Sequence, residues 1–112
     1  MYYYMAKGMI KHRLLAEDLY KYVFSKYNTD LIHIDIYNYT KNHESVYRLV
    51  MECTGKNIQG VKDMIADELG LDDCEVKYFE KDGYVLIYEG ISHEQIVYWY
   101  GYVKKANRLY VC

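Results

Sequence analysis

The spacing of apolar residues changes along the chain and predicts where helices and strands form. Over residues 9–27 the apolar positions recur at helical spacing between charged ones, which is typical of an amphipathic helix. The predicted apolar stripe of this helix consists of Leu15, Leu19, Tyr22, Val23 and Tyr27. Residues 31–39 alternate every second position instead, and this pattern predicts a strand that buries Ile32, Ile34 and Ile36 on one face.

The remaining elements follow from the same reasoning and from turn residues. We expect a strand over 46–53, a helix over 57–69, strands over 74–80 and 84–89, a helix from 92 to about 105 and a short strand over 108–112. Gly70 fits the left-handed residue that ends a helix, and Gly83 fits a positive φ in the loop over 81–83. Residues 92–95, Ser-His-Glu-Gln, have the form of a capping box that opens the last helix.

This order of elements predicts an α+β fold of the form α-ββ-α-ββ-α. The four strands should form a mostly antiparallel sheet with helices on one face, because one face of each strand is apolar and the other is mixed. No linker interrupts the pattern, so residues 1–112 are interpreted as one domain. The segments 31–69 and 74–105 share a ββα order, which raises the alternative of an internal repeat. The order of the strands in the sheet is left open.

Composition and charge narrow the class of protein. Among 112 residues, 52% are apolar and 27% are charged, a balance that favours a packed core over disorder. The formal net charge of −2 is neither the basic excess of most nucleic-acid-binding domains nor the acidity of a nucleic-acid mimic. The three cysteines are far apart, without metal-ligand spacing, and the N-terminus has no apolar signal region. We therefore expect a cytoplasmic protein with reduced thiols, without a membrane span, a metal or a cofactor.

Residues that could carry catalysis are few. His33 and Asp35 lie two positions apart on one predicted strand and thus on the same face, where a carboxylate could orient a histidine as a general base. The alternative is an ordinary solvated sheet face, which the alternation with isoleucines requires anyway. Cys53 continues an apolar strand face and is interpreted as a buried, inert thiol.

The same sheet face could instead bind single-stranded nucleic acid. Aromatic side chains would stack on bases and basic ones would pair with phosphates. The candidate residues for such a platform are His33, Tyr37, Tyr39, Arg48 and Lys77. Nearby carboxylates oppose phosphate, and no recognised RNA-binding motif is present, so this hypothesis ranks second.

The last helix carries more apolar and aromatic residues than one buried stripe needs. Its stripe toward the sheet can be formed by Ile96, Trp99, Tyr100 and Val103. Tyr98 and Tyr102 lie one turn apart on another side, with Gly101 between them. Protein interfaces are enriched in tyrosine and tryptophan, so we predict a partner-binding surface formed by Tyr98, Trp99, Tyr102 and Lys105. The alternatives are that residues 2–4 or the first helix cover this side, and that the 16 tyrosines reflect codon usage.

The leading hypothesis for function is therefore a small protein-interaction module. It would form a homodimer or bind a foreign partner, for example as a phage, viral or mobile-element inhibitor that occludes a host protein. A nucleic-acid-binding domain and a small enzyme that uses the His33–Asp35 pair are the alternatives. An enzyme is the less favoured class, because no catalytic or metal motif is present.

Overall fold

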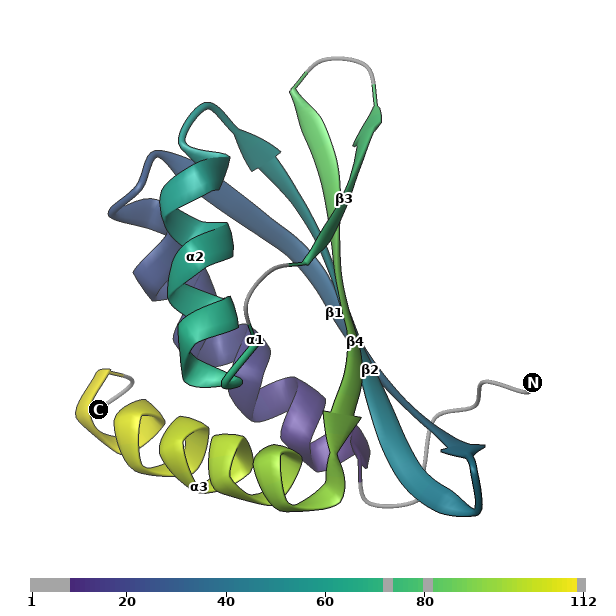
Figure 1. Ribbon diagram of the computed structural model, residues 1–112. Helices are drawn as coiled ribbons and strands as arrows, with labels where there is room; N and C mark the ends of the chain where they lie inside the picture. The colour runs from purple at the N-terminus through teal and green to yellow at the C-terminus, as the bar shows by residue number, and fades with distance from the viewer. Residues whose placement is uncertain (1–8, 72–73, 80–81, 111–112) are drawn as a thin grey trace.

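The computed structural model describes residues 9–71, 74–79 and 82–110, and it has the predicted α+β order of elements (Figure 1). The elements are α1 (Met9–Ser25), β1 (Thr29–Lys41), β2 (Glu44–Gly55), α2 (Ile58–Glu68), β3 (Glu75–Phe79), β4 (Gly83–Ser92) and α3 (His93–Tyr110). All three helices lie on the same side of the sheet. We call that side the inner face and the opposite side the outer face.

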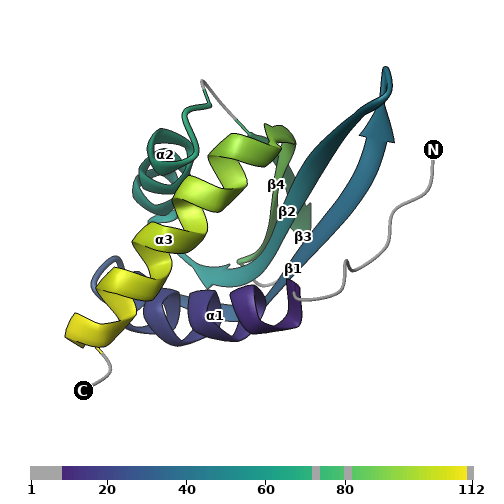
Figure 2. The same cartoon turned by 90° about the horizontal axis from the view of Figure 1, so that it is seen from below.

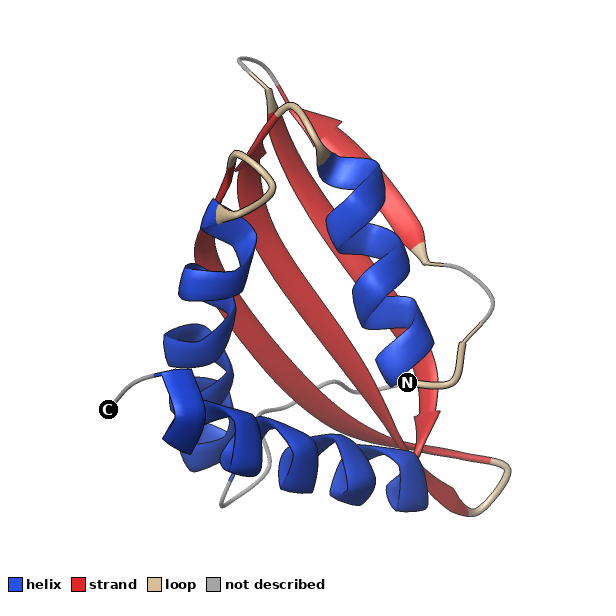
Figure 3. Ribbon diagram, turned by 90° about the vertical axis from the view of Figure 1, so that its left-hand side faces the viewer, coloured by secondary structure: helices blue, strands red, loops and turns tan. Residues whose placement is uncertain are grey.

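The sheet joins two hairpins through their second strands. Its order is β1-β2-β4-β3, and each neighbouring pair is antiparallel. β1 and β3 are therefore the edge strands. Viewed from the helices, the sheet forms a continuous layer behind α1, α2 and α3 (Figure 3). Each hairpin contributes one central and one edge strand, and the internal repeat stays a prediction.

One cluster of buried side chains fills the space between the helices and the inner face. The strands contribute alternate residues, as the period of two requires. Its largest fully buried members are Trp99, Tyr20, Tyr88, Phe24, Leu19, Ile34, Ile36, Leu49, Met51, Ile65, Leu69 and Leu86. The pattern over 57–69 predicts that Val61, Met64, Ile65 and Leu69 face inward. Val61, Ile65 and Leu69 are fully buried, whereas Met64 is only partly buried and packs against the core.

The buried stripe of α1 differs from the prediction. Tyr22 was expected in the stripe but is 47% exposed, whereas Tyr20 and Phe24 are fully buried. Tyr22 lies beneath the Lys26 ammonium group, 4.8 Å from the ring centroid to Nζ. A stripe that contains Tyr22 and a stripe that contains Tyr20 and Phe24 both fit helical spacing. In the structure Tyr20 packs against Trp99 of α3, so the stripe with Tyr20 and Phe24 is the buried one.

A β-bulge overturns the prediction for Ile32. The register of β1 and β2 shifts between Leu31, which faces Cys53, and His33, which faces Glu52. The extra residue, Ile32, is 55% exposed, while Leu31 and Ile34 are both buried three positions apart. A bulge places two residues opposite one and breaks strict alternation, so a prediction based on a period of two assigns Ile32 and the residues before it to the wrong face.

The turns are partly as expected. Gly70 has a φ of +69° and ends α2, where the Leu71 N–H donates to the Ala66 carbonyl and the Gly70 N–H to the Asp67 carbonyl. This is the Schellman motif for which a left-handed glycine is best suited. In the β3–β4 turn the prediction is wrong, since Asp82 has the positive φ, +60°, and Gly83 begins β4. Aspartate tolerates the left-handed region better than most residues.

The C-terminal end of the described chain is helical. Arg108 and its neighbours up to residue 110 belong to α3, so the predicted closing strand over 108–112 is wrong for residues 108–110. Residues 111–112 lie outside the described residues. Residues 2–4 do as well, and the prediction that they cover α3 stays a prediction.

Candidate functional site

α3 is the element that carries the predicted interaction residues, and its first turn is capped as expected. The Gln95 N–H donates to the Ser92 hydroxyl at 3.2 Å, as in a helix N-cap. Among the side chains of α3 that the structure describes, Ile96, Trp99, Val103 and Ala106 form the buried stripe, whereas Tyr100, also expected there, is only partly buried. Trp99 is fully buried, so its assignment to a partner-binding surface is wrong: the residue belongs to the core.

A polar network beneath α3 links the three helices. The Trp99 indole N–H donates to the Tyr20 hydroxyl at 3.1 Å, and the Tyr20 hydroxyl in turn donates to the Glu68 carboxylate of α2. Burial raises the pKa of Glu68, and hydrogen bonds from Tyr20 and Tyr102 offset part of that shift. Burial, together with the Glu68 charge, likewise holds the pKa of Tyr20 well above its usual value. The polar ends of the buried aromatic rings are therefore satisfied within the helical layer.

Glu68→Gln is expected to remove a pH-dependent component of stability. Because the pKa of Glu68 is raised in the fold, between the ordinary glutamate value and this raised value the folded protein holds a proton that the unfolded chain has released. The free energy of unfolding therefore falls as pH rises through this interval. The amide does not titrate, so the variant should gain stability relative to the wild type as pH rises and then level off.

Urea unfolding followed by Trp99 fluorescence, from about pH 4 to about pH 8, measures this difference. Glu44→Gln, at the exposed first residue of β2, is the matched control. A difference between Glu68→Gln and wild type that does not change with pH would contradict the assignment.

The outward side of α3 exposes several large side chains. Tyr98 is 72% exposed, Val97 52% and Tyr102 43%. Together with Gly101 and Lys105 they line a hollow of about 380 Å³. Three of the predicted interaction residues, Tyr98, Tyr102 and Lys105, therefore lie together at the surface. α3 runs across the front of the molecule in the view from below (Figure 2).

The residues that line this hollow have the spacing of a hole in knobs-into-holes helix packing. Tyr98, Gly101, Tyr102 and Lys105 occupy positions i, i+3, i+4 and i+7, the four residues that form a hole for a side chain of a facing helix. We call these four residues the α3 hole. A Cβ atom added at Gly101 would meet nothing within 4 Å, so no packing inside the domain requires glycine there. Glycine in a helix interior destabilises it by about 1 kcal/mol relative to alanine, which leaves close approach from outside as a physical reason for it.

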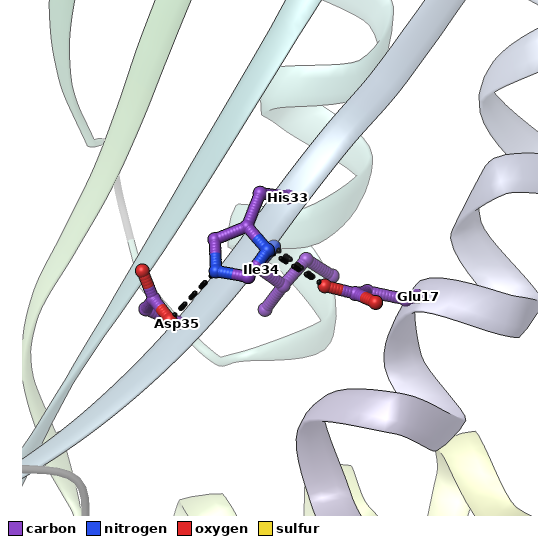
Figure 4. A network of polar contacts seen from close by, with 4 residues as sticks. All are labelled: Glu17, His33, Ile34 and Asp35. Atoms are coloured by element: carbon purple, nitrogen blue, oxygen red, sulfur yellow. Dashed lines mark hydrogen bonds and ion pairs between the residues drawn. The ribbon is translucent and has the colours of Figure 1, made fainter. Parts of the chain in front are cut away.

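His33 and Asp35 form the pair predicted from the sequence, but a third group completes it. The imidazole lies between two carboxylates, with Nε2 2.9 Å from Asp35 and Nδ1 3.0 Å from Glu17 of α1 (Figure 4). The same Glu17 oxygen accepts the Ile34 N–H at 3.3 Å, so it also caps the free edge of β1. Both ring nitrogens face carboxylates, and neither is left to abstract a proton from a substrate. The geometry is that of a polar cluster that ties α1 to β1.

The predicted aromatic and basic platform is only partly assembled. Tyr39 is 4% exposed, so its assignment as a base-stacking residue is wrong. Its hydroxyl donates to Glu89 at 2.7 Å, and Arg48 Nε lies 2.9 Å from the other oxygen of Glu89. Tyr37 lies opposite Arg48 in the register, and burial, then the neighbouring Asp35, raises its pKa.

The charges on the outer face do not favour phosphate. Lys77 is exposed on β3, but His33 and Arg48 each contact a carboxylate. The register also places Glu52 and Glu75 on this face. A hollow of about 280 Å³ lies beside the bulge, where Ile32, Glu52, Thr54 and Val85 are among its lining residues. No basic side chain of the described residues lines this hollow. Together with the carboxylates that contact His33 and Arg48, this lining does not support the nucleic-acid alternative.

The thiol of Cys53 is poorly suited to act as a nucleophile, and the described residues show no metal centre. Burial raises the pKa of the Cys53 thiol to about 11, with a smaller contribution from Cys74, so almost no thiolate is present at neutral pH. No group of three or more histidine, cysteine, aspartate or glutamate residues is arranged to hold a metal ion in the described part of the chain. Within the same residues, no helix has the length and apolar character that crossing a membrane requires.

Sequence reasoning missed three residues that organise these sites. Glu17, Glu68 and Glu89 each contact residues between 16 and 50 positions away, and each occurs on an amphipathic or alternating element where a glutamate is unremarkable. For the α3 hole, by contrast, the sequence did carry a signal, because Gly101 is a glycine inside a helical pattern.

Comparison with protein-family models, with curated proteins and with solved structures finds no match for this chain.

Proposed function

We propose that the protein is a protein-interaction module that binds a helical segment of another polypeptide at the α3 hole. The observation that carries this proposal is the hole itself, with exposed tyrosines on either side of a glycine whose Cβ position is empty. A helix that lays a large apolar side chain over Gly101 would bury Tyr98 and Tyr102 together, the kind of aromatic contact that dominates many interfaces.

The residues that line the α3 hole indicate which side chains a partner helix would present. The aromatic residues favour a large apolar side chain at the centre, and Lys105 at one end favours an acidic residue about one turn away. We propose more specifically that the protein is an inhibitor that uses this surface to occlude a host protein.

Blocking the hole is expected to abolish partner binding without unfolding the protein. Gly101→Arg places a long side chain where the partner would pack, in a position with open space around Cβ. Tyr98→Arg removes the most exposed aromatic ring of α3. Loss of a central interface residue of this type typically weakens binding by about 2 kcal/mol or more, roughly thirtyfold.

The measurement is capture from lysate by the tagged full chain, with bound proteins quantified by mass spectrometry after nuclease treatment. Tyr78→Arg is the matched control, since Tyr78 is also 72% exposed but lies on β3. A stoichiometric protein that Gly101→Arg and Tyr98→Arg lose and Tyr78→Arg retains supports the proposal. Equal capture by all three variants would show that another surface binds.

A further inference from the structure

We infer that the helix bound at the α3 hole is α3 of a second copy of this chain, in an antiparallel arrangement; this inference rests on the proposed function. The outward side of α3 has Glu94, Tyr98, Gly101 and Lys105 at spacings of four, three and four residues, and all four are exposed. We call these residues the α3 seam. This is the spacing of the core positions of a coiled coil.

One antiparallel register satisfies the whole seam at once. In a two-fold dimer, residue i contacts residue j and j contacts i. If Tyr98 packs into the partner's hole over Gly101, the partner's Tyr98 packs over Gly101 of the first chain. The same register places Glu94 beside the partner's Lys105, because both residue pairs are centred at the same point of the helix, between Trp99 and Tyr100.

Charge disfavours the parallel arrangement. A parallel pair in register would place Glu94 against Glu94 and Lys105 against Lys105, which repel each other. The antiparallel pair instead forms two Glu–Lys contacts and two tyrosine–glycine contacts from only four types of residue. The exposed Val97 and Tyr102 flank the seam and would be covered in the same interface.

The size of the seam sets the expected strength. From Glu94 to Lys105 the helix is about 17 Å long at 1.5 Å per residue, so the contact covers about three turns. Interfaces of this size belong to the weak class. We therefore expect a reversible dimer with a dissociation constant on the order of micromolar to tens of micromolar.

A charge exchange tests the register. Glu94→Lys alone and Lys105→Glu alone each replace two attractive contacts by two repulsive ones, and each should raise the dissociation constant about tenfold. An equimolar mixture of the two variants should recover the dimer, since each chain then presents the charge that the other lacks. Sedimentation equilibrium of the full chain, from about 1 μM to about 1 mM, measures all of these states.

Matched controls separate the seam from general charge effects and from folding. Glu75→Lys and Lys77→Glu make the same charge changes at exposed positions of β3 and should leave the dimer unchanged. Urea unfolding of each variant confirms that the monomer is folded. Gly101→Arg should leave a folded monomer at all concentrations.

The possible outcomes distinguish the two proposals. A wild-type dimer that both single variants weaken and their mixture restores supports the inference. A wild-type protein that stays monomeric, a mixture that fails to recover the dimer, or a dimer that tolerates Gly101→Arg overturns it. If the monomeric protein still loses a foreign partner through Gly101→Arg, the dimer is wrong and the proposed function stands.

Discussion

Trp99→Ala is expected to lower the free energy of unfolding by about 3–5 kcal/mol, the range for removing a large aromatic residue from a core. Trp99 is fully buried, stacks on Tyr20 with ring centroids 6.4 Å apart and donates its indole N–H to the Tyr20 hydroxyl. Its loss leaves a cavity between α1 and α3. The Tyr20 hydroxyl also loses one of its two hydrogen-bond partners, while its contact with Glu68 remains.

Such a loss is a large part of the stability of a domain of this size, which is usually about 5–15 kcal/mol. Urea unfolding followed by far-UV circular dichroism measures it, because the variant lacks the only tryptophan. Tyr98→Ala is the natural control, since this neighbouring aromatic residue is 72% exposed and should change stability by less than about 0.5 kcal/mol. Similar losses for the two variants would mean that the buried and exposed sides of α3 are misassigned.

The contrast between these neighbours shows what could be predicted from the sequence. Helical spacing placed Ile96, Trp99, Tyr100 and Val103 on one stripe; the structure buries Ile96, Trp99 and Val103 but leaves Tyr100 only partly buried. The surplus of aromatic residues on α3 then suggested an interface, but it did not separate Trp99 from Tyr98. Exposure depends on how α3 is rotated against α1, and the contacts between these helices, such as that of Tyr20 with Trp99, join residues far apart in the sequence.

The sheet illustrates the same limit. Alternation correctly predicted the buried Ile34 and Ile36, but the bulge moved Ile32 to the surface. A bulge is decided by how two strands pair, and one strand's sequence does not contain that information. The order of elements follows from local patterns, whereas the strand order β1-β2-β4-β3 requires contacts between the hairpins.

The candidate sites were predictable only where their residues are close in sequence. The His33–Asp35 contact follows from the period of a strand, and its distance is 2.9 Å. Glu17 contacts the other ring nitrogen of His33, so the pair is part of a three-residue cluster. Glu17 lies on α1, and the sequence of the strand gives no sign of this contact. Likewise, Tyr39 was expected to be open to a ligand, and its contact with Glu89 of β4 became visible only in the folded chain.

Gly55→Ala is the second substitution for which we expect a large effect, a loss of about 2–4 kcal/mol in the free energy of unfolding. Gly55 has a φ of +149°, which residues with a side chain rarely adopt. An added Cβ would lie 2.7 Å from the Asn28 carbonyl oxygen and 2.6 Å from the Thr29 methyl carbon. Thr29 cannot easily move aside, because it is 2% exposed and its hydroxyl donates to the Phe24 carbonyl at 2.8 Å.

The same substitution at Gly101 should have the opposite sign. Gly101 lies within α3, where an added Cβ meets nothing within 4 Å, so Gly101→Ala should raise the free energy of unfolding by about 0.5–1 kcal/mol. Urea unfolding at concentrations that keep the protein monomeric measures both variants, with equal m-values as the test that only stability changes. If Gly101→Ala destabilises the monomer, glycine is needed for packing inside the domain. In that case the empty Cβ position of Gly101 does not serve a second helix. If Gly101→Ala stabilises the monomer, contact with a helix from outside the domain remains the physical reason for a glycine there.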